Sequence, residues 1–263
     1  MSSADSLNRR RFAGALAAFA SASAIRAADT PDRRTRFYIF QAFDLKQGTQ
    51  SARLTDWFRD TLIPKLEKIS PGPKIVLDAV IGSHTPQLVF IAGFPSFAQI
   101  GEAHSKLAAD SEVAAAFEKL ETGPEPAYES QNNTLIEAAD FSPEVVAEKR
   151  DKPRYFELRV YHSPTERQLQ ALDERFSGPE IKIFHRSGIH PILYGHTMIG
   201  ANMPNLTYLI PFDSLDAREK AWDRFAADPD WVKARKESID KGGQIVSVSQ
   251  VSIYKAAAYS PVR

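Results

Sequence analysis

Three polar side chains alternate along one predicted strand and are the first candidates for a ligand site. Glu157, Arg159 and Tyr161 are spaced two residues apart in the stretch Arg154 to Tyr161, so they share one face of a strand. An arginine guanidinium can hold a carboxylate through two parallel hydrogen bonds. The same face can instead bury a structural Glu157–Arg159 ion pair, because buried ionisable groups are usually paired. Both a ligand anchor and a structural pair are therefore compatible with this pattern.

Tyr208 and His196, on two other predicted strands, are further candidates for the same site. Tyr208 could complete an aromatic pocket with Tyr161, although aromatic residues at alternating strand positions are more often core residues. His196 could serve as the single axial ligand of a haem, and so could His104 on the apolar face of a predicted helix. A histidine that packs or fills space is the plainer interpretation of both. The cofactor is therefore unknown, and haem is one that these histidines could serve.

Motifs and composition argue against several other classes of function. The chain has no cysteine, so it has no disulfide, thiolate metal site or thiol nucleophile. No histidine pair has the H-x-x-x-H or H-E-x-x-H spacing of a helical zinc site, and the serine nucleophile elbow, the P-loop and the dinucleotide-binding glycine motif are missing. The 33 basic and 33 acidic residues cancel, which argues against a nucleic-acid partner. A small molecule remains as the ligand that the candidate residues suit.

An internal repeat determines how these residues are positioned. The window Leu88 to Asp110 aligns on Leu206 to Asp228 at an offset of 118 residues, with seven identities in 23 ungapped pairs. A repeat of this length predicts one structural unit that occurs twice. We expect a first half at residues 36–140, a linker at 141–153 and a second half at 154–258.

Each half has the pattern of a ferredoxin-like unit. Alternating apolar stretches predict strands, and apolar residues spaced three and four apart predict helices, in the order β-α-β-β-α-β. Pro64 is expected to kink the first helix of the first half, and Ser96 with Gln99 to cap the second. The sheet face away from the helices is also partly apolar and must be buried. The predicted fold class is α+β, with the two halves packed sheet to sheet as a barrel within one chain.

Strand alternation separates the side chains that we expect inside the barrel from those that we expect under the helices. The residues assigned to the interior are Tyr155, Glu157, Arg159 and Tyr161 in the second half and Phe37, Ile39, Gln41 and Phe43 in the first. The residues assigned to the helices are Phe156, Leu158 and Val160. One wall of the interior would thus be polar and the other apolar. The face on which His196 lies is left open.

The first residues of the chain are typical of an export signal. Arg9 and Arg10 precede a mild apolar run from Ala13 to Ile25, and small residues follow it. The Arg-Arg-x-Phe sequence resembles a twin-arginine signal. The apolar run is shorter than the roughly 20 residues that a membrane-spanning helix needs. We therefore expect residues 1–28 to be a signal peptide and the mature protein to be periplasmic or otherwise exported. No stable membrane insertion is expected after the signal is removed.

The second half resembles the NIPSNAP family. The stretches that carry the resemblance are Tyr155–Tyr161 (YFELRVY), His185–Gly188 (HRSG), Phe212–Leu215 (FDSL) and Asp228–Trp231 (DPDW). The first half resembles the family more faintly, because Ile39 and Gln41 stand where the E-L-R-x-Y strand has Glu and Arg. The family belongs to the dimeric α+β barrel group, which includes small monooxygenases, haem-binding enzymes and proteins without known chemistry. The resemblance therefore implies the fold more strongly than a function.

Two functions follow from these observations. The first is an exported protein that binds a small molecule in the barrel, with oxygenase-like chemistry as the reaction that the family group suggests. The second is a non-catalytic interaction or scaffold protein whose barrel is filled by Phe37, Phe43 and Tyr208. An open barrel interior favours the first function and a filled interior the second. Either protein could be a monomer or a homodimer.

Overall fold

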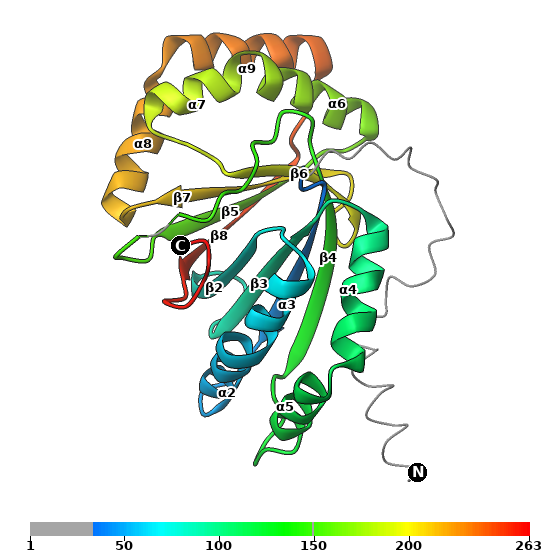
Figure 1. The fold of residues 1–263 in the computed structure, drawn as a ribbon. Helices are drawn as coiled ribbons and strands as arrows, with labels where there is room; N and C mark the ends of the chain where they lie inside the picture. The colour runs from blue at the N-terminus through cyan, green and yellow to red at the C-terminus, as the bar shows by residue number, and fades with distance from the viewer. Residues whose placement is uncertain (1–33, 149) are drawn as a thin grey trace.

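Eight antiparallel strands close a barrel in the computed structural model, which describes residues 34–148 and 150–263 (Figure 1). The strands are β1 (Phe37–Asp44), β2 (Lys74–Ile81), β3 (Gln87–Phe94), β4 (Ser130–Ala138), β5 (Tyr155–His162), β6 (Leu193–Ile199), β7 (Asn205–Phe212) and β8 (Val248–Ala256). Their order around the barrel is β1-β3-β2-β8-β5-β7-β6-β4. Each half contributes four adjacent strands, and the pairs β2–β8 and β4–β6 join the two sheets.

Helices cover the outside of both sheets. Those of the first half are α2 (Gln50–Trp57), α3 (Ile63–Ile69), α4 (Phe97–Ala109) and α5 (Ser111–Glu121). Those of the second half are α6 (Glu166–Arg175), α7 (Ile181–Ser187), α8 (Leu215–Ala227) and α9 (Pro229–Gly242). Figure 1 shows α6 to α9 on the far side of the second sheet from the first half. The predicted order of strands and helices and the ferredoxin-like arrangement of each half are confirmed.

A π-helical turn interrupts the first helical segment of each half. Phe58–Leu62 joins α2 to α3, and Phe176–Glu180 joins α6 to α7, so the two turns begin 118 residues apart. Pro64 follows the first turn; it has no N–H, and its ring would clash with the carbonyl four residues before it in a regular helix. The wider turn accommodates that proline where the sequence predicted a kink. Turns of this kind are frequent at functional sites.

The barrel interior is filled by apolar side chains from both sheets. Its buried members include Tyr38, Phe40, Ile75, Leu77, Val89, Ile91, Ile136, Phe156, Leu193, Leu209 and Tyr254. Leu158 packs against the same cluster. The expectation that Phe156 and Leu158 face the helices was therefore wrong. The interior is enclosed by two sheets, so no helix can supply partners for a charge there, and the apolar set of each strand occupies it.

The predicted interior sets face the helices instead. Glu157 accepts hydrogen bonds from Arg218 and Trp222 of α8, and Tyr161 packs against the core between the second sheet and α6 to α9. Phe37, Ile39 and Phe43 belong to the matching core between the first sheet and α2 to α5. Gln41 also lies on that helix-facing side, against residues of the same core. The sequence predicted correctly which residues share a face of each strand. It assigned the wrong face to the barrel interior, because the set expected inside lies under the helices.

The sequence also predicted a signal peptide and no stable membrane insertion of the mature protein. The expected signal peptide at residues 1–28 lies outside the described residues. Within the described part of the chain, no helix is both long enough and apolar enough to cross a membrane.

Candidate functional site

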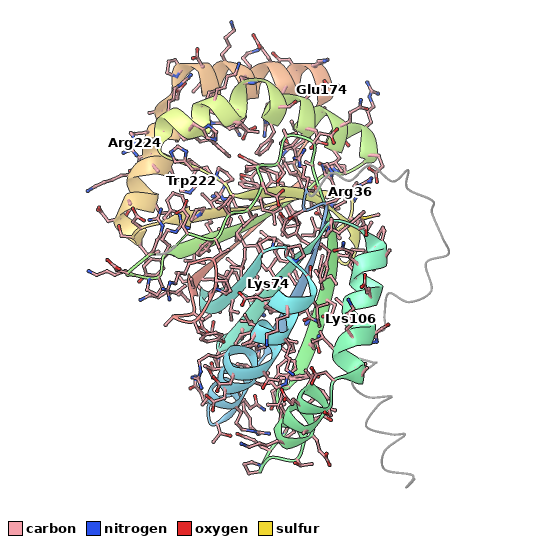
Figure 2. The ribbon with its side chains drawn as sticks, in the orientation of Figure 1. Arg36, Lys74, Lys106, Glu174, Trp222 and Arg224 are labelled. Atoms are coloured by element: carbon pink, nitrogen blue, oxygen red, sulfur yellow. The ribbon has the colours of Figure 1, made fainter. Side chains whose placement is uncertain are left out.

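A buried ionic cluster lies between the second sheet and α8. The side chain of Glu157 is fully buried, and one of its carboxylate oxygens accepts from Arg159 Nε at 2.5 Å. Its other oxygen accepts from Arg218 Nε at 2.5 Å and from Trp222 Nε1 at 2.9 Å. Trp222 lies on α8 between that helix and the sheet (Figure 2). Two guanidiniums therefore neutralise this carboxylate, and the indole N–H supplies a third hydrogen bond to it.

Arg159 is likewise occupied by neighbours within the chain. Its Nη1 donates to the Tyr161 hydroxyl at 2.7 Å, and its guanidinium lies 3.9 Å from the centre of the Trp222 ring. The rings of Tyr161 and Tyr208 meet edge to face at 5.2 Å. Burial raises the pKa of Tyr208 well above its ordinary value, so the phenol stays protonated. The structure thus brings together four of the predicted site residues. Arg159 pairs with Glu157, which is the structural alternative for these two residues, and the Tyr208 side chain joins them through the contact of its ring with Tyr161.

His196 lies on the same helix-facing side but outside this cluster. Its Nε2 is 3.0 Å from a carboxylate oxygen of Asp173 on α6, and its side chain is 31% exposed. His196 therefore faces the helices, which the sequence had left open. Within the described residues, no group of three histidines, cysteines or carboxylates is placed to hold a metal ion.

A second buried ion pair was missed by the sequence reasoning. Arg175, the last residue of α6, donates from Nε to Glu180 at 2.7 Å, and Glu180 is only 1% exposed. Burial raises the pKa of Glu180 to about 7 in spite of the nearby guanidiniums of Arg175 and Arg159. Arg175 also lies over the ring of Trp231 at 5.0 Å. Arg175 directly precedes the π-helical turn and Glu180 is its last residue, at the positions that Trp57 and Leu62 hold in the first half. The signal that could have found the pair is the repeat, because the 118-residue offset places these two charges opposite two apolar residues.

The equivalent space in the first half is an apolar cavity. It lies between the first sheet and α2 to α5 and has a volume of about 50 Å³. Its walls include Ile39, Phe43, Leu54, Trp57, Leu62, Phe90, Ile100, Ala103, Leu107, Phe117 and Leu120. The polar groups of its lining residues are those of Gln41, His104 and Gln131, the indole N–H of Trp57 and the hydroxyl of Tyr128. The cavity is therefore an apolar space with a few polar groups, which is the usual composition of a small-molecule site.

The residues at equivalent positions of the two halves, 118 apart in the sequence, explain why one space is filled and the other is open. The cavity residues Ile39, Gln41, Trp57, Leu62, Ile100 and His104 correspond in order to Glu157, Arg159, Arg175, Glu180, Arg218 and Trp222. In the second half five of these six positions carry charges that pair across the space, and Trp222 is the sixth. In the first half the same positions carry mostly apolar side chains, which leave a void. The sequence showed this asymmetry, but we assigned it to the barrel interior.

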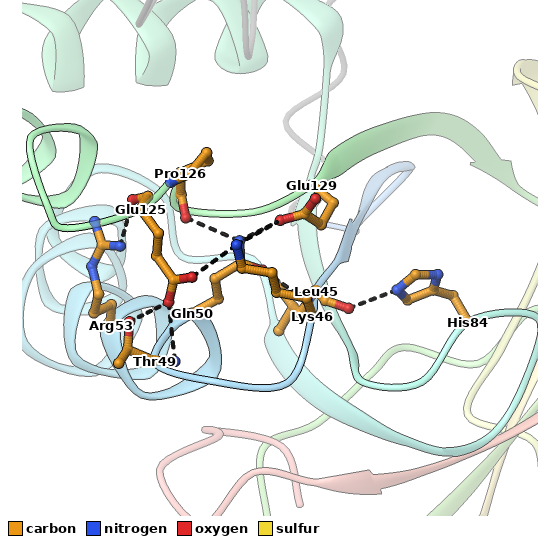
Figure 3. A network of polar contacts seen from close by, with 9 residues as sticks. All are labelled: Leu45, Lys46, Thr49, Gln50, Arg53, His84, Glu125, Pro126 and Glu129. Carbon is orange, nitrogen blue, oxygen red and sulfur yellow. Dashed lines mark hydrogen bonds and ion pairs between the residues drawn. The ribbon is translucent and has the colours of Figure 1, made fainter.

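A polar network joins the start of α2 to the segment between α5 and β4 (Figure 3). The carboxylate of Glu125, in the segment between α5 and β4, accepts from the backbone N–H of Thr49 at 3.1 Å and pairs with Lys46 at 2.9 Å. Gln50 is fully buried and donates to the Pro126 carbonyl at 3.0 Å. These bonds hold the segment that contains Tyr128, a cavity residue, against the start of α2.

The residues of both spaces do not fit a haem. His104 borders a cavity of about 50 Å³, which is far smaller than a porphyrin. The second-half space, which His196 borders, is filled by the ionic cluster and by buried aromatic rings such as Phe176 and Tyr208. Neither histidine therefore has the apolar slot that an axial haem ligand requires.

The second half of the chain matches a known protein family. Residues 156–261 match the NIPSNAP family. This NIPSNAP segment contains the Glu157 cluster and all four strands of the second sheet except the first residue of β5. No curated protein matches the chain in sequence.

Solved structures extend the fold likeness over both halves. A candidate monooxygenase of Fusobacterium nucleatum is 12% identical over 85% of this chain and 93% of its own, with a TM-score of 0.54. An anthrone oxidase-like protein is 17% identical over 85% of this chain and 92% of its own, with a TM-score of 0.52. A NIPSNAP family protein of Agrobacterium tumefaciens is 23% identical over 43% of this chain and 97% of its own, with a TM-score of 0.38. The first two structures show that both halves together have the fold of α+β barrel proteins.

Proposed function

We propose that the protein binds a small, largely apolar molecule between the first sheet and helices α2 to α5. The observation that carries this proposal is the contrast between the two halves, because the space that is filled by ion pairs in the NIPSNAP segment is open and apolar in the first half. Binding in the barrel interior, as first expected, is not supported, since side chains of both sheets fill it.

The cavity walls indicate what kind of molecule would fit. The indole N–H of Trp57 is buried and has no hydrogen-bond acceptor among the residues that the structure describes. A buried donor without an acceptor costs free energy, so a ligand atom that accepts this bond would be favoured. Aromatic rings of Phe43, Phe90 and Phe117 supply the remaining contact surface. An aromatic ligand with a carbonyl or hydroxyl oxygen meets both conditions.

A route to the cavity leads through the groove between α2 and α5. This groove has a volume of about 210 Å³ on the outer surface, and Trp57 and Leu120 line both the groove and the cavity. Rotation of these two side chains would join the two volumes. A ligand as large as anthrone needs both, because a cavity of about 50 Å³ is smaller than the roughly 150 Å³ that holds a benzene ring. Trp57 directly precedes the π-helical turn Phe58–Leu62, where the regular hydrogen bonding of the helix is already interrupted.

The reaction that we propose to test is oxygenation of the bound ligand by dioxygen. The names of the two structures that share the whole fold, a candidate monooxygenase and an anthrone oxidase-like protein, support this reaction class. In oxidation of an anthrone-type methylene, the ligand supplies four electrons to O2. One oxygen atom becomes the new carbonyl and the other leaves as water, so no external reductant is needed.

A non-catalytic interaction protein is the second candidate, and the filled barrel interior favours it. The two candidates differ in one result. Anthrone added to the purified protein should accelerate oxygen uptake above the rate in buffer if the first is correct. No acceleration, together with no measurable binding of anthrone, would leave the interaction protein as the better assignment.

Ala103 and Ala221 provide a matched test of the cavity. They correspond at the 118-residue offset and both are buried, but only Ala103 lines the cavity. Valine costs each helix about 0.5 kcal/mol in propensity. In Ala103→Val the two added methyl groups enter the void, whereas in Ala221→Val they overpack a filled core, which costs about 1–3 kcal/mol. We expect Ala103→Val to be more stable than Ala221→Val by about 2 kcal/mol in urea unfolding.

The same pair tests the ligand proposal. Ala103→Val should weaken anthrone binding at least tenfold, because the added methyl groups occupy the ligand's volume, and Ala221→Val should leave it unchanged. Isothermal titration calorimetry on folded protein measures both affinities. Equal anthrone affinity in the two variants would contradict a ligand site at this cavity.

We also propose export to the periplasm, on the basis of the N-terminal sequence alone. Arg9→Lys together with Arg10→Lys should hold the full-length chain in the cytoplasm, because paired arginines define the twin-arginine signal. Cell fractionation and the mass of the secreted chain measure this. A periplasmic product of unchanged amount from the double variant would rule out that route.

A further inference from the structure

We propose a second binding site, a groove between α9 and the start of β8 that takes an amphipathic carboxylate. This groove, called here the α9 groove, has a volume of about 230 Å³. Its polar lining residues are Tyr161, Arg175, Arg235, Gln244 and Ser249, and its apolar ones are Trp231, Ile239, Ile245 and Val246. The site is independent of the first-half cavity and does not rest on the function proposed for it.

Two guanidiniums give the α9 groove its preference for an anion. No carboxylate lies within ion-pair distance of Arg235 anywhere in the described part of the chain, although other cations of α9, Lys233, Lys236 and Lys241, are each paired. Arg175 is nine-tenths buried and has Glu180 as its one acidic partner. Two positive charges thus face at most one negative charge. The excess of positive charge suits an anion, and guanidiniums bind carboxylates well because their planar donors match the two oxygens.

The apolar residues that line the groove would favour a ligand whose carboxylate is attached to an apolar group. The ring of Trp231 packs at 4.4 Å on Phe225 and carries the guanidinium of Arg175 at 5.0 Å, so it forms a fixed aromatic floor. Ile239 is 39% exposed on the next turns of α9, and Ile245 is buried below it. An aromatic or aliphatic body could cover Trp231 and Ile239 while its carboxylate reaches the arginines. Covering exposed apolar surface would favour binding.

The α9 groove is a property of the second half alone. At the offset of 118 residues, Arg175, Trp231 and Arg235 correspond to Trp57, Val113 and Phe117. Trp57 and Phe117 line the apolar cavity, and Val113 is fully buried. The two halves therefore present opposite surfaces at equivalent positions, one suited to a neutral ligand and the other to an anion. The ionic cluster at Glu157 lies deeper and its donors are already occupied.

The test uses 2-naphthoate as the probe and calorimetry on the folded protein. We expect saturable binding of one molecule, and at least tenfold weaker binding of the uncharged analogue 2-naphthalenemethanol. Arg235→Glu should weaken naphthoate binding at least tenfold. Lys233→Glu is the matched control, because it makes the same charge change on α9 outside the groove, and it should change the affinity less than twofold. Both positions are exposed, so both variants should unfold at nearly the wild-type temperature.

Several outcomes would overturn the proposal. Equal loss of affinity in Arg235→Glu and Lys233→Glu would show general electrostatic attraction rather than a site. Equal binding of the alcohol and the carboxylate would remove the role of the guanidiniums. Tighter binding of 2-naphthyl phosphate than of 2-naphthoate would overturn the assignment to carboxylates.

Discussion

Replacement of Glu157 by alanine should destabilise the protein by about 3–5 kcal/mol, which is the usual cost of breaking a buried ion pair from one side. The Glu157 side chain is fully buried, and it is the shared acceptor of Arg159, Arg218 and Trp222. Without it, the mostly buried guanidiniums of Arg159 and Arg218 lose their shared counter-charge, and their partial desolvation is no longer compensated. Urea unfolding at pH 7, followed by tryptophan fluorescence, measures the loss.

Glu137→Ala is the matched control for this prediction. Glu137 pairs with Arg36 at 2.7 Å, but the two side chains are 32% and 57% exposed. Exposed pairs contribute about 0–1 kcal/mol, so this variant should remain close to wild type. If both alanine variants lose the same small amount, the Glu157 cluster is not a buried stabilising element. Anthrone binding should survive in Glu157→Ala molecules that remain folded, because the cavity belongs to the other sheet.

The second large effect is a pH dependence of stability that arises from Glu180. Its pKa is raised from 4.5 to about 7 by burial, and the charged or titratable groups that act on it or are influenced by it are Arg175, Arg159, Tyr194 and Tyr208. A raised folded-state pKa means that the native protein binds the proton more tightly than the unfolded chain does. The stability from this group is therefore full below pH 4.5 and is lost as the pH rises towards and through 7. A shift of this size corresponds to a loss on the order of 3 kcal/mol.

Glu180→Gln isolates this contribution, because an amide oxygen can still accept from Arg175 but does not ionise. We expect wild type to lose stability relative to Glu180→Gln between pH 5 and pH 8, while other titrating groups affect both proteins equally. The measurement is the free energy of unfolding of both proteins in urea at half-unit pH steps. Parallel pH profiles would mean that Glu180 is ionised in the folded protein across this range, held so by Arg175.

Local sequence patterns predicted the elements of this fold well. The order of strands and helices in both halves followed from apolar periodicity, because each element buries one face. Ser96 was expected to cap a helix, and its hydroxyl accepts from the backbone N–H of Gln99 at 3.3 Å. The 118-residue offset anticipated two similar halves, and both π-helical turns fall at that spacing. These features depend on neighbours within a few residues or on direct comparison of the chain with itself.

The sequence by itself determined which side chains share a face of each strand, and thus that Glu157, Arg159 and Tyr161 lie together. It could not determine which way that face points, because both faces of each sheet are buried in this barrel, one by the other sheet and one by helices. Only the tertiary structure decided this, since the partners of Glu157 that settle the matter are Arg218 and Trp222, about 60 residues further along the chain. The first-half cavity could not be predicted for a similar reason. Its volume depends on how side chains that are distant in the sequence pack together, and no local sequence pattern contains that information.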